Sequence, residues 1–284
     1  SQSVFSMSFL DFQKRMVTDY RIKQGRALLQ QYKPIFSAIQ KQYGVPGEVL
    51  IAFWAFETDF GKNMGDFDTI PALATLAWDC RRPDKFREQL IGALELYDKG
   101  DLELSDMKGA WAGEIGHTQF LPKEYYETAV DFDGDGHRNL RRSIPDAMAS
   151  GAALLVKHGW KANQPWIEEV KLTKDLPWDQ ADIAIQLPRS QWVKWGVQGV
   201  EGKLKADKFP ASLLLPMGKD GPAFLAYDNF TTAYLKWNES LVYSTTAAYL
   251  ATRIAGAGPF DPGRAPVHAL SYQQIIQLQK ILQS

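Results

Sequence analysis

The stretch FWAFETDFGKNMG, residues 53–65, places a single carboxylate, that of Glu57, among aromatic side chains. Residues three or four positions from Glu57 lie on the same face of a helix. Those residues are Phe53, Trp54 and Phe60. Burial among aromatic rings disfavours an ionised carboxylate, so we expect a raised pKa and a protonated form near neutral pH. The segment therefore predicts a general acid. A core glutamate satisfied by an arginine or by backbone donors is the alternative that these residues leave open.

The length and composition of the chain are those of a globular protein with a substantial core. It has 284 residues, enough for one large or two ordinary domains, and 45% of them are hydrophobic. Aromatic residues make up 12%, including 9 tryptophans, which suits stacking on sugar rings, although a single tryptophan more often belongs to the core. The lone Cys80 excludes an internal disulfide and a cysteine-built metal site.

Charge and hydropathy exclude two further classes of protein. The net charge is −1, with 32 basic and 33 acidic residues interspersed, so we expect no nucleic-acid partner. No apolar run approaches the roughly 18 residues of a membrane span, so we expect no transmembrane segment. The opening residues SQSVFSMSF lack the charged and apolar regions of a signal peptide, so cellular location has to be inferred from other features.

The first part of the chain, up to about residue 163, has the apolar periodicity of helices. The expected helices span residues 21–44, 47–60, 70–79, 85–100 and 143–160. Gly44, followed by Pro46, stops the first of them. Ser143 or Asp146 can cap the start of the last.

Between residues 165 and 227 the pattern changes to short β-prone runs separated by proline and glycine, which predicts a small β subdomain. The expected strands are 166–172, 181–187, 211–216 and 223–227, with a helical turn at 190–197. Helices return at 229–238 and 240–256. The segment 256–266 is typical of a linker, and 270–284 of a last amphipathic helix.

A glycine-rich segment, residues 108–126, is the second candidate for function. Its glycines permit a close backbone approach or positive φ, and they precede the polar trio His117, Thr118 and Gln119. Fixed donors and acceptors of this kind suit the hydroxyl and acetamido groups of a sugar. Taken alone, these residues favour the alternative of a tight connection between helices.

The third candidate is DFDGDGHRN, residues 131–139, which matches the opening of an EF-hand calcium loop. The matching residues are Asp131, Asp133, Asp135 and Gly136. Alternate carboxylates of such a loop converge on a hard cation, and the glycine permits the sharp turn.

The later positions of this loop depart from the EF-hand pattern. Position 7 is His137, where such loops contribute a backbone carbonyl, and position 12 is Arg142 in place of a bidentate glutamate. We therefore expect Asp146 to supply the late carboxylate. The sequence predicts a structural Ca²⁺ bound by Asp131, Asp133, Asp135, His137 and Asp146, with a solvated acidic turn as the alternative.

Taken together, the ordered motifs resemble the lytic murein transglycosylases of the membrane-bound B (MltB) type. The first is the ETxxG segment at 57–61, and the second the GxxGxxQFxP segment at 113–122. The DFDGDGH loop with DAMASGAALLVKHGW follows, and then GPAFLAYDNFTTAYLKWNESLVYSTTAAYLATRI. The resemblance covers residues 21–254, nearly the whole chain.

This resemblance implies a mainly α, α+β fold: a lysozyme-like helical core with an additional α domain and a small β subdomain. It also implies cleavage of the MurNAc–GlcNAc β-1,4 bond of peptidoglycan without water, leaving 1,6-anhydro-MurNAc. Glu57 falls on the family's single catalytic residue, an acid that then acts as a base, with no cofactor for catalysis. The substrate-binding positions implied are His117, Gln119, Phe120, Trp237, Asn238 and Tyr243.

The expected domain division follows the same resemblance. Residues 1–45 are the N-terminal helical part of the α domain, and 46–164 the catalytic core with the EF-hand-like loop. Residues 165–227 are the β subdomain, and 228–256 the helices that complete the core. Residues 257–284 are a linker and the start of a truncated peptidoglycan-binding module.

The chain departs from the family pattern near the expected site. Trp237 stands where tyrosine is usual, Ala110 where serine is usual, and Glu114 with Ile115 where small and methionine-type residues are usual. A lysozyme-type hydrolase, with Glu114 or another acid activating water, is thus one alternative function. A non-catalytic, calcium-stabilised peptidoglycan-binding protein is another. For Glu114 we expect a structural or orienting role, hydrogen-bonded within its loop or to a basic group.

The implied partners are peptidoglycan glycan strands, with cell-wall synthesis or secretion machinery as candidate protein partners. The implied location is the periplasm of a Gram-negative bacterium, with a lipid anchor in the outer membrane as one form of attachment.

Overall fold

The computed structural model describes residues 7–79, 81–200 and 202–264. Its first half is built from the helices α1 (Phe9–Met16), α2 (Asp19–Gln31), α3 (Lys33–Tyr43), α4 (Gly47–Thr58), α5 (Thr69–Asp79), α6 (Pro83–Lys99), α7 (Pro122–Thr128) and α8 (Ile144–Lys157). A 3₁₀ turn, η1 (Leu104–Asp106), and the short strands β1 (Phe67–Asp68) and β2 (Lys108–Gly109) lie among them.

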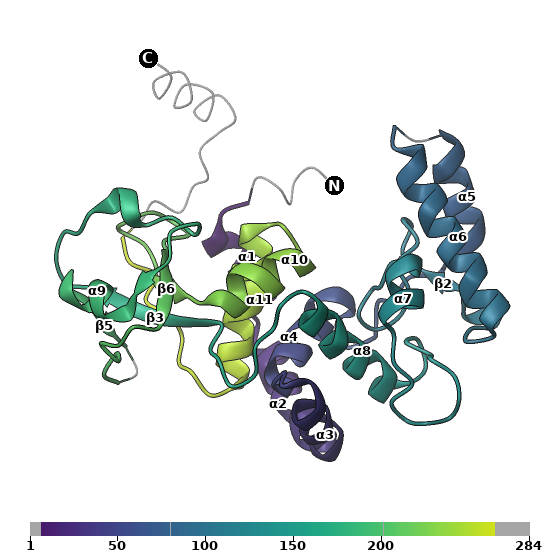
Figure 1. Ribbon diagram of the computed structural model, residues 1–284, viewed down its shortest axis with the longest axis horizontal. Helices are drawn as coiled ribbons and strands as arrows, with labels where there is room; N and C mark the ends of the chain where they lie inside the picture. The colour runs from purple at the N-terminus through teal and green to yellow at the C-terminus, as the bar shows by residue number, and fades with distance from the viewer. Residues whose placement is uncertain (1–6, 80, 201, 265–284) are drawn as a thin grey trace.

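The second half contains the strands β3 (Ile167–Leu172), β4 (Leu187–Pro188), β5 (Val197–Gly199), β6 (Pro210–Leu214) and β7 (Phe224–Ala226). Its helical elements are the 3₁₀ turn η2 (Trp178–Gln180), α9 (Arg189–Lys194), the π-helix η3 (Phe230–Tyr234), α10 (Leu235–Trp237) and α11 (Leu241–Ile254). In Figure 1 a central helical body has the sheet on one side and the projecting α5–α6 hairpin on the other.

Helix α4 lies at the centre of the helical body. Its apolar residues from Val49 to Ala55 are all buried, with Ile51 and Phe53 fully enclosed. A helix that is apolar on every side is stable only when neighbours cover it all round. Helices α2, α3, α8 and α11 provide that cover. The catalytic candidate Glu57 is therefore held on the most enclosed of the described helices.

The expected single helix over 21–44 is two helices. Helix α2 ends at Gln31, and α3 begins at Lys33 with Pro34 in its first turn. A proline inside a helix lacks the N–H for the i→i−4 bond and clashes with the preceding turn, so the chain reorients at Tyr32. Gly44 ends α3 as expected, at φ 71°.

The sheet has five strands in the order β4-β6-β7-β3-β5, and all neighbours are antiparallel. One face contributes Ile167, Leu214 and Phe224 to the core of the helical body. The opposite face has its own apolar cluster, in which Trp192 of α9 is fully buried. The sheet therefore joins the helical body through one face and α9 through the other.

Two details of the sheet differ from expectation. The β-prone run 181–187 is mostly not a strand: only Leu187 and Pro188 pair, since Asp182 starts a turn by accepting from the N–H of Ala184 at 2.8 Å. Strand β5, Val197–Gly199, was not expected, because three residues ending in glycine carry little periodic signal.

The start of the expected linker is packed against the helical body. Phe260 is buried, and its ring lies 4.8 Å from that of Tyr249 and 5.5 Å from that of Phe9. The expected last helix, 270–284, lies outside the described residues.

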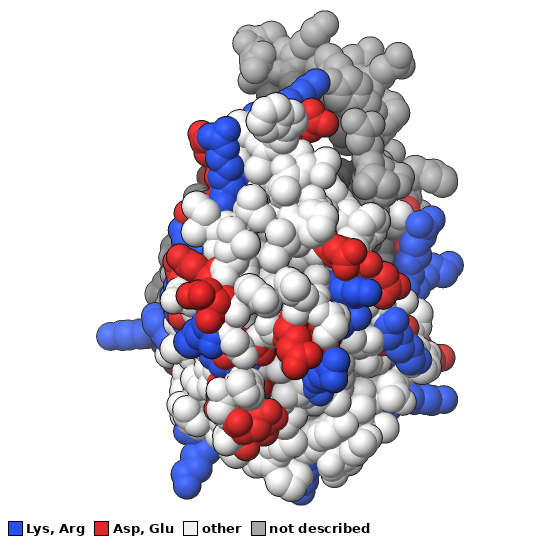
Figure 2. All heavy atoms as spheres, turned by 90° about the vertical axis from the view of Figure 1, so that its right-hand side faces the viewer, with Lys and Arg blue, Asp and Glu red and all other residues white. Residues whose placement is uncertain are grey.

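Surface charge is mixed. Figure 2 shows basic and acidic side chains interspersed over the face formed by the α5–α6 side of the protein, in keeping with a net charge of −1. Within the described residues, no helix has the length and apolarity to cross a bilayer.

Candidate active site

Glu57 lies in the last turn of α4, beside the rings that the sequence placed near it. Phe53 and Trp54 are buried, and Phe53 stacks on Trp237 with ring centroids 4.2 Å apart. Phe60 does not share the helical face of Glu57, because the helix ends at Thr58 and Phe60 has φ 59°. Its ring packs instead against the edge of Trp54, at 5.7 Å.

Two neutral side chains, one from α10 and one from α11, donate hydrogen bonds to Glu57. The hydroxyl of Tyr243 reaches Oε1 at 2.5 Å, and the indole N–H of Trp237 reaches the same oxygen at 3.1 Å. The described residues provide no hydrogen bond to Oε2. Within this described part of the chain, Glu57 is thus not a core glutamate satisfied by an arginine or by backbone donors. Its Oε1 is anchored by two hydrogen bonds, and its Oε2 receives none from the described residues.

The surroundings shift the pKa of Glu57 in opposing directions. Burial raises the pKa of this carboxyl most strongly, the hydrogen bonds from Tyr243 and Trp237 lower it, and the negative charge of Glu114 raises it. The net pKa is raised above its ordinary value. A larger fraction of Glu57 is therefore protonated near neutral pH than for an exposed glutamate, as a general acid requires.

The glycine-rich segment forms one wall of the site through very close backbone contacts. Gly109 pairs with Phe67 and also bridges to Ile115, which in turn bridges to Phe120. A Cβ at Gly109 would lie 1.8 Å from the carbonyl oxygen of Glu114, so only glycine fits there. The segment is a tight antiparallel fold of the chain rather than a helix–helix connection.

Gln119 is fixed within this wall. It has φ 55°, and its side-chain N–H group donates to the carbonyls of Met64 at 3.1 Å and Gly116 at 3.0 Å. The position of the Gln119 side chain therefore depends on the backbone of two segments, one that follows α4 and one in the glycine-rich turn.

Glu57 opens onto a cavity of about 440 Å³. Four of the residues expected to bind substrate line it: Gln119, Phe120, Trp237 and Asn238. Thr118 of the polar trio lines it too. Residues that the sequence did not single out also line it: Trp111, Leu121, Glu124, Leu154, His158 and Lys236. Trp111 had a usable signal, being an aromatic residue in the glycine-rich segment. The others belong to helices or turns with no local pattern.

Two expected substrate-binding residues lie behind this cavity. Tyr243 acts on Glu57 through its hydroxyl and is not among the lining residues. His117 is buried, and its Nδ1 accepts a hydrogen bond from the indole N–H of Trp54 at 3.0 Å. Burial lowers the pKa of His117, which favours the neutral ring that this acceptor role needs. His117 thus supports the wall of the cavity from behind, and its contact with substrate stays a prediction.

The acidic loop brings four of its expected ligands together. Carboxylate oxygens of Asp131, Asp133, Asp135 and Asp146 all lie within 4.8 Å of one another. Gly134 and Gly136, at φ 76° and 92°, form the turn, and both N–H groups donate to Asp131, at 2.8 and 2.9 Å.

Asp146 holds this loop from the start of α8. It is fully buried and accepts from the backbone N–H groups of Phe132 at 2.7 Å and Asn139 at 3.0 Å. Arg142 lies at position 12, and its guanidinium is paired with Asp106 at 2.7 Å. The late carboxylate of the cluster is therefore Asp146, as expected. His137 contributes a backbone N–H bond to Asp135 at 2.8 Å, and its side chain is exposed.

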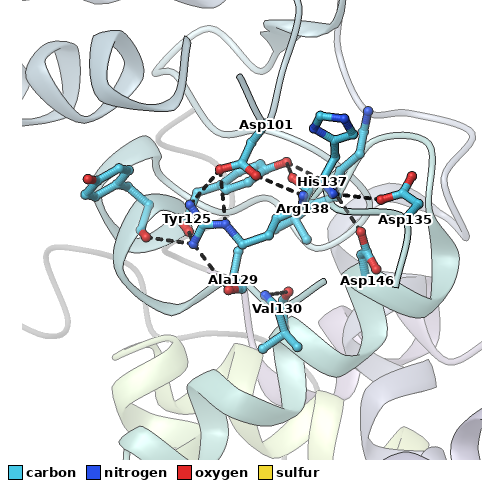
Figure 3. A network of polar contacts seen from close by, with 12 residues as sticks. Asp101, Tyr125, Ala129, Val130, Asp135, His137, Arg138 and Asp146 are labelled. Atoms are coloured by element: carbon cyan, nitrogen blue, oxygen red, sulfur yellow. Dashed lines mark hydrogen bonds and ion pairs between the residues drawn. The ribbon is translucent and has the colours of Figure 1, made fainter. Parts of the chain in front are cut away.

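A buried ion pair ties the loop to the end of α6. Figure 3 shows Arg138 paired with Asp101, and the atoms Nη2 and Oδ2 lie 2.8 Å apart. The Nη1 of Arg138 also donates to the carbonyl of Tyr126 at 2.8 Å. The hydroxyl of Tyr125 accepts from the N–H of Leu140 at 2.9 Å.

The acidic loop offers a metal ion only oxygen atoms, most of them from carboxylates. This set of ligand atoms fits a hard cation such as Ca²⁺.

The helical core, the small antiparallel sheet and a cleft around one raised-pKa glutamate define a lysozyme-like α+β protein. Comparison with known families assigns it further. The model of the transglycosylase SLT domain matches residues 1–252, and the chain belongs to that family.

A curated relative is the membrane-bound lytic murein transglycosylase B of Escherichia coli strain K12. It is 34% identical over 154 residues, which cover 54% of this chain and 42% of the relative. The match thus spans less than half of the relative's length.

Solved structures match over more of the chain. SltB3 of Pseudomonas aeruginosa, in complex with NAG-NAM-pentapeptide, is 38% identical with a TM-score of 0.91, covering 98% of this chain and 75% of that one. The same protein with NAG-anhNAM-pentapeptide is 39% identical with a TM-score of 0.87, covering 93% and 70%. Escherichia coli SLT35 in complex with calcium is 28% identical with a TM-score of 0.74, covering 87% and 78%.

Proposed function

We propose that this chain is a lytic murein transglycosylase, which cleaves the MurNAc–GlcNAc β-1,4 bond of peptidoglycan and leaves 1,6-anhydro-MurNAc. The observation that carries the proposal is Glu57: one acid of raised pKa, anchored at Oε1 by Tyr243 and Trp237, on a cleft of about 440 Å³. Family membership and the complexes of SltB3 with NAG-NAM and NAG-anhNAM pentapeptides support it.

In the proposed reaction one carboxyl group serves twice. Protonated Glu57 gives its proton to the leaving O4 as the C1–O4 bond breaks, and the substrate's acetamido group stabilises the developing positive charge. The carboxylate of Glu57 then takes the proton of the C6 hydroxyl as O6 bonds to C1. Bonds and protons balance, and no water enters.

Tyr243 and Trp237 have a defined part in this scheme. Their hydrogen bonds favour the ionised form of Glu57, so they stabilise the carboxylate that exists between the two proton transfers. Burial favours the protonated form at the start. Because these two effects shift the pKa of Glu57 in opposite directions, the same carboxyl group can act first as an acid and then as a base.

Product mass is the test of this function. Purified peptidoglycan digested with the protein should yield muropeptides with anhydro ends, each lighter by one water than a reducing-ended product. Reducing-ended products would instead identify a hydrolase, for which Glu114 in the same cavity is the candidate second acid. Binding to sacculi without any product would identify a non-catalytic peptidoglycan-binding protein.

We also propose that the acidic loop binds a structural Ca²⁺ through Asp131, Asp133, Asp135, the backbone carbonyl of His137 and Asp146. Support comes from the convergence of the four carboxylates and from the complex of the relative SLT35 with calcium. The ion would neutralise the clustered negative charge and fix the loop against α8. No step of the reaction passes through it.

Peptidoglycan strands are the proposed partner, and the periplasm of a Gram-negative bacterium is the proposed location. The relative in Escherichia coli is described as membrane-bound, and no described helix of this chain can cross a bilayer. Fractionation of the producing cells, with detection by antibody, tests this location.

A further inference from the structure

Trp237 and Tyr243 reach the same oxygen of Glu57 from two different helices. Trp237 is the last residue of α10, and Tyr243 lies in the first turn of α11. The hydrogen bonds that Glu57 accepts from side chains of the described residues come from these two alone. The position of α10 relative to α11 therefore decides whether Oε1 receives both donors.

The glycine-rich wall supplies Glu57 with no further donor among the described residues. Ala110 lines the cavity with a methyl group, which cannot donate. Glu114 lines it too, and its Oε2 is buried without a hydrogen-bond partner in the described part of the chain. For this oxygen, the expected bond within the loop or to a basic group is not formed. The hydrogen bonds that orient Glu57 thus depend on the segment that carries α10 and α11.

The two donors are held in different ways. Tyr243 belongs to a long helix that packs against α4, and the hydroxyl of Ser240 caps its start by accepting from the N–H of Tyr243 at 3.2 Å. Trp237 ends a helix of only three residues, which is too short to be stable by itself. The indole of Trp237 stacks on Phe53, but its backbone has to be held by contacts outside α10.

Ser244 of α11 provides such a contact. It is fully buried, and its Oγ lies 2.7 Å from the carbonyl oxygen of Asn238 and 3.2 Å from that of Tyr234. These two carbonyls lie on either side of Trp237 in the chain. The last carbonyls of a helix have no partner within it, so a hydroxyl from the next helix can bind them. Ser244 therefore joins the end of α10 to the first turn of α11.

This use of a helical serine is unusual. A serine hydroxyl inside a helix commonly bonds to a carbonyl of its own helix, three or four positions earlier. The partners of Ser244 lie six and ten positions earlier, in the preceding helical segment. The hydroxyl has one proton to donate, and the shorter distance assigns it to Asn238.

We propose that Ser244 is a positioning residue, which holds the indole of Trp237 on Glu57 by tying the end of α10 to α11. Its importance for turnover rests on the proposed function. Without this tie, Tyr243 is the one described donor held in place beside the carboxylate that forms between the two proton transfers.

Titration of the Glu57 carboxyl, followed by ¹³C NMR with Glu57→Gln to identify the signal, tests the assignment without turnover. The hydrogen bond from Trp237 lowers the pKa of Glu57, so Ser244→Ala should move the midpoint to higher pH. Thr246→Val is the matched control, because it removes a buried hydroxyl of α11 that bonds to Val242 of the same helix at 2.6 Å. The control should leave the midpoint in place. A midpoint of Ser244→Ala like that of the control overturns the proposal.

A double-mutant cycle tests whether Ser244 acts through Trp237. In a Trp237→Phe background there is no indole N–H to hold, so Ser244→Ala should add no further shift of the midpoint. In a Tyr243→Phe background it should still shift the midpoint. The opposite result in either background overturns the proposal. The charged and titratable side chains that line the cavity with Glu57 are unchanged in all these variants: Glu114, Glu124, His158 and Lys236.

Turnover measures the consequence for the proposed reaction. The net contribution of one hydrogen bond corresponds to about 2- to 10-fold, so kcat of Ser244→Ala on purified peptidoglycan should fall by that factor. The alkaline limb of activity should move to higher pH, and Thr246→Val should change neither quantity. An unchanged kcat overturns the role of Ser244 in the reaction. Anhydro-ended products from the wild type decide the proposed function separately, because the titration midpoint of Glu57 is measured without substrate.

Discussion

Glu57 and the acidic loop use the same functional group in opposite surroundings. At Glu57 a single carboxyl is buried among rings, receives two neutral donors and has a raised pKa. In the loop, four carboxylates converge and are held largely by backbone N–H groups. Isolation in an apolar site favours a proton, whereas convergence favours a cation. The difference shows that the neighbouring groups, and not the residue type, decide whether a carboxylate binds a proton or a metal cation.

The largest expected effect removes the proton. Glu57→Gln should lower the release of anhydro-muropeptides from purified peptidoglycan by roughly 10²- to 10⁴-fold, the range for general acid–base catalysis. Its melting temperature and its binding to sacculi should be retained, since glutamine preserves the shape of the side chain. A variant that keeps more than about a tenth of the wild-type turnover would remove Glu57 from the acid role.

Removing one of the hydrogen-bond donors to Glu57 should have a smaller effect on turnover. Tyr243→Phe removes a hydrogen bond that lowers the pKa of Glu57, so the pKa should rise and the alkaline limb of activity should move to higher pH. Turnover at neutral pH should fall by about 10-fold, because the ionised intermediate form loses a charge-assisted bond.

Trp237→Phe is the matched variant, since it keeps a ring against Phe53 but loses the indole N–H. It should shift the alkaline limb in the same direction, to higher pH. A limb that moves to lower pH in either aromatic variant would show that these donors do not favour the carboxylate form.

In the loop, the expected effect is on stability. Calcium at about 100 times its Kd should stabilise the folded protein by about 2.7 kcal/mol, because the unfolded chain cannot gather the ligands. Calorimetry should show a melting temperature that rises with calcium and falls with chelator. Asp133→Ala should blunt this response, whereas Asp84→Ala, at an exposed carboxylate of α6, should leave it intact. Identical melting curves across calcium and chelator would exclude the site.

The smallest expected effect is that of calcium removal on turnover, which tests whether the acidic loop and the cleft around Glu57 act independently. Below the melting temperature of the chelated protein, removal of calcium should leave kcat on peptidoglycan unchanged, because no step of the proposed reaction at Glu57 uses a metal. Initial rates with and without chelator measure this. A loss of kcat while the protein stays folded would couple the loop to the cleft.

The sequence predicted the loop well because its determinants are local. The four carboxylates lie within one short segment, and the glycines between them set the turn. Helices with strong periodicity were also predicted closely, including the cap at Ser143, whose hydroxyl accepts from the N–H of Asp146 at 3.2 Å. The break at Tyr32 was missed because helical periodicity continues through Pro34.

The cleft was predictable only in part because its determinants are distant. The aromatic surround indicated an acid at Glu57, but its donors are separated from it by 180 residues for Trp237 and 186 for Tyr243. No pattern within α4 could identify them, and only the family resemblance placed them near the cleft. The burial of His117 behind the wall could not be predicted, because a polar residue in a turn gives no sign of which side of the wall it faces.

The distance between Glu57 and its donors has a consequence for biosynthesis. The acid is translated long before the residues that anchor its Oε1, and α10 and α11 follow the whole sheet in the chain. A nascent or truncated polypeptide that stops before residue 237 contains the glutamate but no assembled site. Under the proposed reaction, activity therefore requires the docking of α10 and α11, and a chain that stops before residue 237 is expected to be inactive.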